Sequence, residues 1–321
     1  VDIEFERNGE VIKALAQTTK TGLTFLLNRE TGEPIFPIEE KEVPQGAIKG
    51  DYVSKTQPFP TKPAPLNPIY FDPEKAFGFT FWDRGHCKRT AKKLRNEGLF
   101  TPPSLQGSIH YPSGVGGNNW GGPAIDPKRN IMVVNTNNMA SLIVMVPRED
   151  CNKPLEELSI NKTQVRFTNV EANEGAPYCN LRSMGFFSPL GVPCTEPPWG
   201  TLTAIDLNTG EHLWNVPLGT SKDLAPFPFW WIKGAPNIGG PTVTASGVTF
   251  IGATSDHYLR AFNTETGEEL AKFRLPTGAH ATPMTYTNKQ GKQFVVIAAG
   301  GHWAVGSPAS DHLIAYTLPE K

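Results

Sequence analysis

The sequence contains one short motif three times, and any fold for this chain has to accommodate all three copies. They read LTFLLNRETGE at residues 23–33, LTAIDLNTGE at 202–211 and LRAFNTETGE at 259–268. Each begins with the alternating pattern typical of a strand, continues with Asp or Asn, and turns at Thr-Gly before a second strand begins. Glycine reaches the positive φ that such a turn needs at little steric cost, so each copy predicts a β-hairpin.

A strand–turn–strand unit precedes the hairpins, at residues 122–134, 240–252 and 281–298. One unit followed by one hairpin gives four strands in about 40–50 residues, which is the blade of a β-propeller. The turn glycines Gly210 and Gly267 lie 57 residues apart, close to that period. We therefore predict an all-β protein with about four four-stranded propeller blades. The alternative is a β-sandwich, which gives no reason for a repeated Thr-Gly-Glu.

Two long segments interrupt the repeat, at about 36–110 and 147–198. The first is rich in proline over residues 36–75 and reads as an extended surface insertion. Residues 84–98 hold six Lys and Arg side chains and predict a short helix that ends at Gly98. Either a solvated helix face or a docking surface would explain these charges. Insertions of this kind lie on one face of a propeller, often the active face.

The four cysteines are Cys87, Cys151, Cys179 and Cys194. None forms a Cys-x-x-Cys pair, which argues against a zinc site or a thioredoxin-type motif. In an oxidising compartment one disulfide among the last three is expected, because all three lie in the second irregular segment. Isolated buried thiols are the open alternative.

Charge and chain ends narrow the function classes. The 30 Lys and Arg residues nearly cancel 31 Asp and Glu residues, so the net charge gives no electrostatic reason to expect nucleic acid or an anionic membrane. No stretch of 18 apolar residues occurs, and the start has no signal-peptide pattern. The first strands, around residues 11–27, begin within a blade, and a final strand at 312–318 lacks its Thr-Gly hairpin. We expect one partial propeller over residues 1–321 whose earlier blades lie upstream.

Several strings resemble the PQQ-dependent (quinoprotein) dehydrogenases, and most closely the C-terminal part of the membrane-bound glucose/quinate/shikimate branch. They are residues 20–29, 44–52, 98–103, 119–127, 199–206, 239–243, 250–254 and 300–302, spread over essentially the whole chain. The resemblance implies an eight-bladed propeller with pyrroloquinoline quinone (PQQ) in its axial channel and a bound Ca²⁺ or Mg²⁺. It also implies periplasmic exposure at the inner membrane and transfer of electrons to ubiquinone.

Five residues match positions that this family places at the cofactor. Lys20 matches its quinone-contacting lysine, whose fixed cation stabilises the negative charge that hydride transfer puts on a quinone oxygen. Asn135 matches an asparagine beside the cofactor, and a turn-opening asparagine is the alternative. Trp120 offers an indole face for stacking, although propeller tryptophans also pack between blades. His302 matches a histidine near cofactor and substrate, and Trp303 follows it.

The same resemblance places other parts upstream. The family's general base is an aspartate further from the lysine than residues 1–19 allow, and Asp2 is the only Asp in that stretch. The metal ligands are upstream as well, so we expect no catalytic base and no metal ligand in this chain and no dehydrogenase activity from it alone. Asp256 and His257 read as a turn. Glucose, quinate, shikimate or another polyol all fit as substrate. The rival hypotheses are a non-catalytic propeller scaffold that binds protein and a half-propeller that forms oligomers through its open sheet edges.

Overall fold

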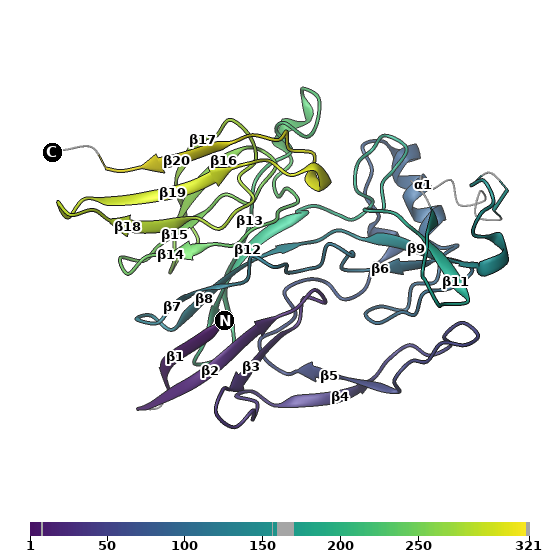
Figure 1. The fold of residues 1–321 in the computed structure, drawn as a ribbon, viewed down its shortest axis with the longest axis horizontal. Helices are drawn as coiled ribbons and strands as arrows, with labels where there is room; N and C mark the ends of the chain where they lie inside the picture. The colour runs from purple at the N-terminus through teal and green to yellow at the C-terminus, as the bar shows by residue number, and fades with distance from the viewer. Residues whose placement is uncertain (8, 156, 159–169, 319–321) are drawn as a thin grey trace.

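The chain folds into consecutive antiparallel sheets that are the blades of a propeller, with irregular insertions at one end (Figure 1). The computed structural model describes residues 1–321 apart from residues 8, 156, 159–169 and 319–321. Three of the blade sheets run in the order of the sequence, as an up-and-down meander requires. The predicted all-β propeller is therefore confirmed.

The four blades consist of the following strands. Blade I has β1 (Asp2–Arg7), β2 (Glu10–Thr18) and β3 (Thr24–Asn28). Blade II has β7 (Ala124–Asp126), β8 (Ile131–Asn137), β12 (Gly200–Asp206) and β13 (His212–Pro217). Blade III has β14 (Thr242–Val243), β15 (Val248–Ile251), β16 (Tyr258–Asn263) and β17 (Glu269–Arg274). Blade IV has β18 (Met284–Thr287), β19 (Gln293–Ala299) and β20 (His312–Tyr316). Blades I and IV have three strands each, one fewer than the four predicted for a blade, and in blade I the strand β1, paired with β2, precedes the strands expected around residues 11–27.

The three Thr-Gly turns have one geometry. Gly32, Gly210 and Gly267 have φ of 79°, 72° and 74°. Each donates its N–H to the carbonyl four residues earlier, at 2.8, 2.8 and 2.9 Å. The Asp or Asn at that earlier position also accepts from backbone N–H groups inside the turn. The repeated Asp/Asn and Gly are thus explained by one turn that needs a side-chain acceptor at its start and a positive φ near its end.

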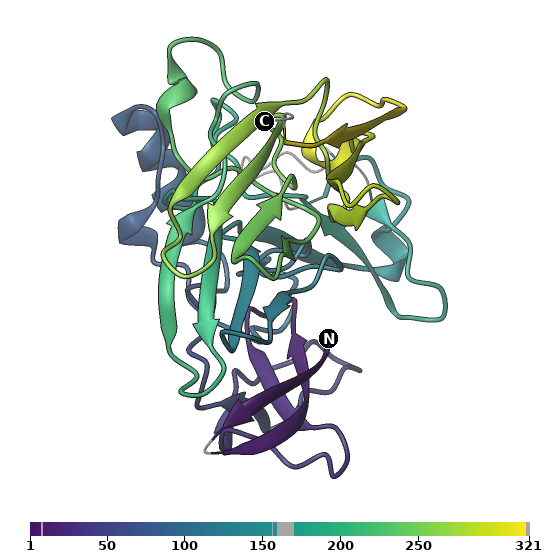
Figure 2. The same ribbon diagram turned by 90° about the vertical axis from the view of Figure 1, so that its left-hand side faces the viewer.

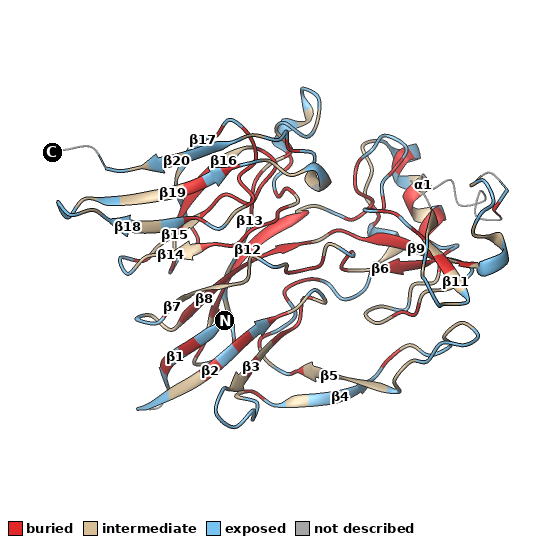
Figure 3. Ribbon diagram, viewed as in Figure 1, coloured by how far each residue is buried: buried red, intermediate tan, exposed pale blue. Residues whose placement is uncertain are grey.

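Neighbouring blades pack face to face through small and branched apolar side chains. Ile3 and Phe5 alternate with exposed charged residues along β1 and pack with Met132 and Ile205 of blade II. Further clusters join blade II to blade III and blade III to blade IV. Figure 3 shows the result, with buried residues concentrated in β8 and β12 and exposed ones on β4 and the outer strands. A period-2 burial pattern with both faces partly covered is what stacked sheets require.

The insertions form a cap at one end of the blades (Figures 1 and 2). Its sheet contains β6 (Ser108–His110), β9 (Ser141–Pro147), β10 (Val170–Glu171) and β11 (Tyr178–Arg182). Beside it are a hairpin of β4 (Ile38–Glu42) and β5 (Thr56–Pro60), helix α1 (Phe81–Ala91) and short 3-10 turns η1 (Pro73–Lys75), η2 (Arg148–Asp150), η4 (Phe229–Trp231) and η5 (Trp303–Val305). None of the helices in the described part of the chain is long and apolar enough to cross a bilayer.

The predicted basic helix exists, but its bounds differ. It begins at Phe81 because the Thr80 side chain caps the N–H of Asp83 at 3.1 Å, and it ends at Ala91, well before Gly98. A capping Thr side chain indicates where a helix begins, whereas the position of the first Lys or Arg does not. Apolar spacing within this helix is weak, which is why its N-terminal turn was missed.

Two disulfides hold the cap together. Cys151 pairs with Cys179 inside the second insertion, as one of the open alternatives had it. Cys194 pairs with Cys87 of α1 across 107 residues, a pairing that sequence spacing gave no means to predict. All four cysteines are therefore paired, and the alternative of isolated thiols is wrong.

Candidate functional site

The loops that join the second and third strands of each blade lie at the end of the molecule that carries the cap. These loops hold Lys20 in blade I, the second insertion in blade II, residues 252–257 in blade III and residues 300–311 in blade IV. In an up-and-down sheet alternate loops share one edge, so four separate stretches of sequence meet there. The candidate site is built at this end.

Lys20 lies in a tight turn of blade I. Gly22 has φ of 79° and donates to the carbonyl of Thr19 at 3.0 Å, which closes the turn. A Cβ on Gly22 would come within 2.7 Å of Asn67 Oδ1, so this close approach to the cap insertion also requires glycine. The ammonium of Lys20 donates to the Gly114 carbonyl at 3.1 Å and is otherwise exposed.

A cavity of about 580 Å³, named here the channel cavity, lies between blades I and II and contains two of the predicted residues. Lys20 lines it together with Trp120, whose side chain is 65% exposed. The polar part of the wall also includes Gln17, Thr18, Thr19, Asn118 and Asn119. A cation and a free indole face on one cavity are suited to an anionic, planar ligand.

Asn135 lies on β8 and is 5% exposed, and its carbonyl accepts from Asn118, which lines this cavity. Its Nδ2 donates to Asn237 Oδ1 at 2.6 Å and to the Gly239 carbonyl at 2.8 Å. These two acceptors fix which end of the amide is nitrogen. Its Oδ1 is buried and has no partner among the described residues, so what Asn135 offers to a further group is an acceptor.

Buried asparagines that sequence reasoning missed connect three blades around Asn135. Asn118 accepts from Thr18 of β2 at 2.5 Å and donates to the Asn135 carbonyl at 3.0 Å. Asn237, before β14, donates from its Nδ2 to the Thr136 carbonyl at 2.9 Å. Each amide both donates and accepts, so one residue type satisfies several backbone groups at the blade junctions. In the sequence, the polar run of residues 135–138 was the only hint that buried amides gather at this junction.

His302 and Trp303 lie on the loop of blade IV, at the same end but outside the channel cavity. The two rings stack at 6.1 Å with 17° between their planes, and Trp303 is 82% exposed. The ring of His280 lies 6.2 Å from that of His302. The structure thus brings Lys20 and Trp120 together on the channel cavity, links Asn135 to that cavity through Asn118, and places His302 with Trp303 apart from them.

His280 is a second histidine at this end, and sequence reasoning did not find it. Its ring is buried, with Nδ1 2.9 Å from the Ala253 carbonyl and Nε2 2.9 Å from Ser307 Oγ. Burial lowers its pKa, and the hydrogen bond to Ala253 offsets only part of that effect. The neutral ring therefore donates from Nδ1 and accepts the Ser307 hydroxyl at Nε2. It ties the loop of blade III to that of blade IV.

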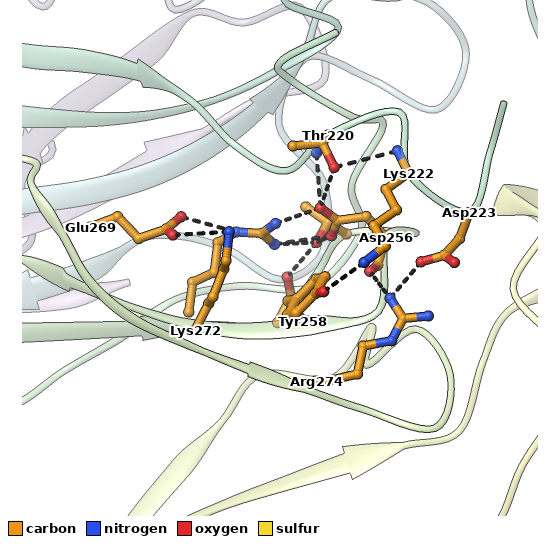
Figure 4. A network of polar contacts seen from close by, with 11 residues as sticks. Thr220, Lys222, Asp223, Asp256, Tyr258, Glu269, Lys272 and Arg274 are labelled. Carbon is orange, nitrogen blue, oxygen red and sulfur yellow. Dashed lines mark hydrogen bonds and ion pairs between the residues drawn. The ribbon is translucent and has the colours of Figure 1, made fainter. Parts of the chain in front are cut away.

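Asp256 is the centre of a buried polar network that holds the blade III loop (Figure 4). The carboxylate accepts from the N–H and hydroxyl of Thr220 at 2.9 and 3.0 Å and from Thr254 Oγ1 at 2.6 Å. Arg260, 3% exposed, donates to both of its oxygens. Burial by itself would raise the pKa of Asp256, but the hydrogen bonds and charge of Arg260 outweigh it and hold the pKa below its usual value.

This network explains how the adjacent loop keeps an unusual backbone. Ala253 and His257 both have φ of 58°, a conformation that costs about 1 kcal/mol for residues with a Cβ. The loop binds His280 through the Ala253 carbonyl, and Ser255 donates to the Val305 carbonyl at 2.9 Å. Asp256 therefore anchors the segment against which the histidine loops rest, which is more than the simple turn predicted from the sequence.

Around Tyr258 the network continues to the surface. Four cations lie 5.1–5.6 Å from its ring: Lys222, Arg260, Lys272 and Arg274. The hydrogen bond from Lys222 to the phenol oxygen, at 3.1 Å, is the main cause that lowers the pKa of Tyr258. Asp223 and Glu269 neutralise Arg274 and Arg260 in turn.

A second cavity of about 330 Å³, named here the cap cavity, lies between the blades and the cap. Its walls are mostly apolar and include Phe79, Met139, Phe187, Leu190 and Trp199. Asn137, Asn237, Ser255 and Val305 line it on the blade side, so it borders both the asparagine and the histidine groups. Among the described residues no three His, Cys, Asp or Glu side chains come together as a metal site.

Comparison with known proteins agrees with this geometry. Residues 1–295 match the family described as PQQ: glucose/ethanol/alcohol dehydrogenase, β-propeller domain. The chain is 40% identical over 323 residues to quinoprotein glucose dehydrogenase of Escherichia coli K12, covering 98% of this chain and 39% of that protein. It is 37% identical over 318 residues to quinate/shikimate dehydrogenase (quinone) of Acinetobacter baylyi, covering 97% and 39%.

A more distant relative is the glycerol dehydrogenase large subunit of Gluconobacter oxydans, 35% identical over 325 residues, covering 98% of this chain and 44% of that protein. Among solved structures, quinohemoprotein alcohol dehydrogenase from Comamonas testosteroni superposes with a TM-score of 0.55 at 19% identity, covering 100% of this chain and 39% of that one. At that identity the likeness concerns the fold alone. The chain spans about 40% of the length of these relatives.

Proposed function

The chain belongs to the PQQ-dependent quinoprotein dehydrogenase family, and from this premise we propose that it is the C-terminal part of an enzyme that oxidises a sugar or polyol and passes electrons to a quinone. The observation that carries the proposal is the channel cavity, whose wall contains Lys20 and Trp120 from different blades, together with Asn118, which donates to the Asn135 carbonyl. The named relatives support either a glucose-type or a quinate/shikimate-type substrate.

The residues present fit PQQ. The cofactor is a flat, anionic ortho-quinone with carboxylates and a pyrrole N–H. Lys20 supplies a cation, Trp120 an indole face and Asn135 an unpartnered buried acceptor, which are three groups of the matching kinds. PQQ, when bound, would accept a hydride, which carries both electrons, from the substrate alcohol.

The chain's own residues then have separate tasks. Lys20 provides a positive charge for the oxygen that becomes negative; the tight Gly22 turn fixes its backbone, and the Gly114 carbonyl accepts from its ammonium. His280, neutral and held at both ring nitrogens, keeps the loop with His302 in place. We propose that His302 and Trp303 contact substrate or cofactor at the mouth. Trp303 is exposed beside the cap and His302, directly before it in sequence, is half-buried, so Trp303 is the more accessible of the two.

Several parts of the proposal rest on family resemblance. In this family the aspartate base and the ligands of Ca²⁺ or Mg²⁺ precede the lysine by more residues than this chain has before Lys20. We therefore propose that the isolated chain does not turn over sugars. We also propose that the whole protein is periplasmic, is anchored to the inner membrane and reduces ubiquinone.

Two measurements on the isolated chain test these statements. PQQ should quench its tryptophan fluorescence saturably, and Lys20→Ala should weaken that binding while Lys128→Ala, at the opposite end of blade II, should not. With PQQ and Ca²⁺ or Mg²⁺ added, dye reduction with glucose or quinate should stay at background. Clear turnover would overturn the proposed inactivity, and absence of PQQ binding would favour the rival scaffold function. A mass above that of the monomer in size exclusion would support oligomers through the sheet edges.

A further inference from the structure

A further cavity, named here the side cavity, lies beside Lys20 and has a volume of about 210 Å³. Its wall is formed by the Lys20 turn and by residues 98–101 and 109–114. Lys20 also lines the channel cavity, so one side chain borders both cavities. The ammonium of Lys20 donates to the carbonyl of Gly114 in this wall at 3.1 Å. The side cavity is therefore next to the place where the proposed function puts the quinone oxygen.

Two buried polar atoms of this wall have no hydrogen-bond partner among the described residues. They are Nε2 of His110, at the end of β6, and Oγ of Ser113, a residue that is 4% exposed. An unpaired polar atom in the interior costs free energy, so nearly all such atoms in native proteins have a partner. A hydroxyl group suits both atoms, because it can donate or accept as each of them requires. The pair therefore indicates a ligand that carries hydroxyl groups.

The charge of the wall narrows the class of that ligand. Burial lowers the pKa of His110, so its ring is neutral near pH 7. Burial, with a smaller contribution from Glu196, raises the pKa of the Tyr111 phenol, which also lines the cavity and keeps its proton. Among the described residues of the wall, Lys20 is the one charged side chain, and the proposed function uses its charge at the quinone. An uncharged ligand therefore fits this wall better than one whose carboxylate needs a cation of its own.

The wall also contains a residue with an unusual backbone conformation. Phe100 has φ of 65°, which is rare for a side chain of this size. Its turn is held by Thr101, whose N–H and hydroxyl both donate to the Gly98 carbonyl, at 3.2 and 2.6 Å. The Thr101 hydroxyl also accepts the N–H of Glu97 at 3.0 Å. Strain enforced in this way is concentrated at ligand sites, and an aromatic wall with a few placed polar groups is typical of them.

We propose that the side cavity binds the non-reacting hydroxyl groups of an uncharged sugar or polyol, with His110 and Ser113 as specificity-determining residues. The inference rests on the proposed function and deepens it, since it selects a glucose-type substrate over a quinate/shikimate-type one. At about 30 Å³ for each water molecule, the cavity has room for roughly seven waters, whose places the hydroxyls of such a substrate can take. The carbon to be oxidised then lies on the Lys20 side, which both cavities share.

Saturation-transfer NMR on the whole chain, with and without PQQ, measures this binding directly, with D-glucose and quinate as the probes. D-glucose should bind saturably, and quinate at least about tenfold more weakly.

Variants assign the binding to the side cavity. His110→Phe keeps a ring without its nitrogens and Ser113→Ala removes one hydroxyl, so each should weaken glucose binding about three- to tenfold, the effect of one neutral hydrogen bond. His110→Phe is the more specific of the two, because Ser113 also borders the cap cavity. The matched control is Thr195→Val. Its hydroxyl is also buried and unpartnered among the described residues but lies outside this wall, so the variant should bind glucose as wild type does.

PQQ-induced fluorescence quenching, measured on the same variants, separates this inference from the proposed function. Weakened glucose binding with unchanged PQQ binding supports the side cavity. Absence of glucose binding by wild type, with and without PQQ, would overturn the inference, as would equal affinities for glucose and quinate or equal effects of the cavity and control variants. Absence of quenching would refute the proposed PQQ site instead, and the glucose titrations without PQQ would still decide the inference. Circular dichroism checks the fold of each variant, and Ser113→Ala, the smaller change, decides if His110→Phe does not fold.

Discussion

Removal of the Asp256 charge is the most informative stability experiment on the candidate site. Asp256→Asn keeps the shape of the side chain but leaves the 3%-exposed guanidinium of Arg260 beside a neutral group. Arg260 then retains a 3.2 Å contact to Glu269, whose side chain is 39% exposed and too solvated to replace a buried carboxylate. Breaking a buried pair in this way costs about 3–5 kcal/mol in the free energy of unfolding.

Urea unfolding followed by circular dichroism measures this cost. The matched control is Glu269→Gln, which removes the exposed partner of the same arginine and should cost at most about 1 kcal/mol. The sign with pH follows from the lowered pKa of Asp256. Its contribution is present above the unfolded pKa of about 3.9 and is lost as the pH falls further through the folded pKa. The difference between wild type and Asp256→Asn should therefore shrink only in strong acid.

Two outcomes would refute this reasoning. A loss below about 1 kcal/mol for Asp256→Asn would mean that the network is solvated in solution and that its charge pair contributes little. If Asp256→Asn and Glu269→Gln lowered the free energy of unfolding equally, the ion pair of Arg260 with Glu269 on β17 would matter as much as its pair with Asp256. In either case Asp256 would not be the anchor of the loop that supports His280.

Three further predictions concern the cap, the repeated turn and the histidine. Cys87→Ser with Cys194→Ser should lower the free energy of unfolding by about 4–5 kcal/mol. Cys151→Ser with Cys179→Ser should lower it by about 3–4 kcal/mol, because that disulfide closes a shorter loop. Denaturant titration of the two double variants compares these losses. Gly267→Ala should cost more than Gly32→Ala in the same titration, since both need a positive φ but only a Cβ at Gly267 meets Trp214, at 2.7 Å. The ¹⁵N NMR shifts of His280 should stay those of a neutral ring well below pH 6.5, because its pKa is lowered; an ordinary titration there would contradict its buried, doubly bonded placement.

The repeat was the part of the fold that the sequence could predict, because one local turn geometry recurs in three copies. Thr-Gly after Asp or Asn needs only nearby atoms to form. Contacts between segments far apart in the chain have no such recurring motif in the sequence from which they could be predicted. Cys87 and Cys194 are 107 residues apart, and Asn135 finds Asn237 across 102 residues.

The sequence also did not predict which charged and aromatic side chains are exposed and which are buried. The near-zero net charge describes the whole chain and does not show that α1 carries the exposed cations Arg84 and Arg89 together with the exposed Phe81 and Trp82. Asp256 read as a turn residue because its partners, Thr220 and Arg260, approach it from a loop and a strand that only the folded blade brings near. In both cases the role of a side chain depends on how far it is buried, and the composition of the chain does not give that.

The central claim is that Lys20 of this chain belongs to a PQQ pocket, and a chimera tests it most directly. In quinoprotein glucose dehydrogenase of Escherichia coli K12, this chain would replace the segment of about the same length that it matches. We expect the chimera to reduce dye with glucose only when PQQ is added. Lys20→Ala should lower that turnover about 10²-fold or more, and Lys128→Ala should leave it unchanged. A chimera that folds and binds PQQ but is equally active with Lys20→Ala would contradict the claim.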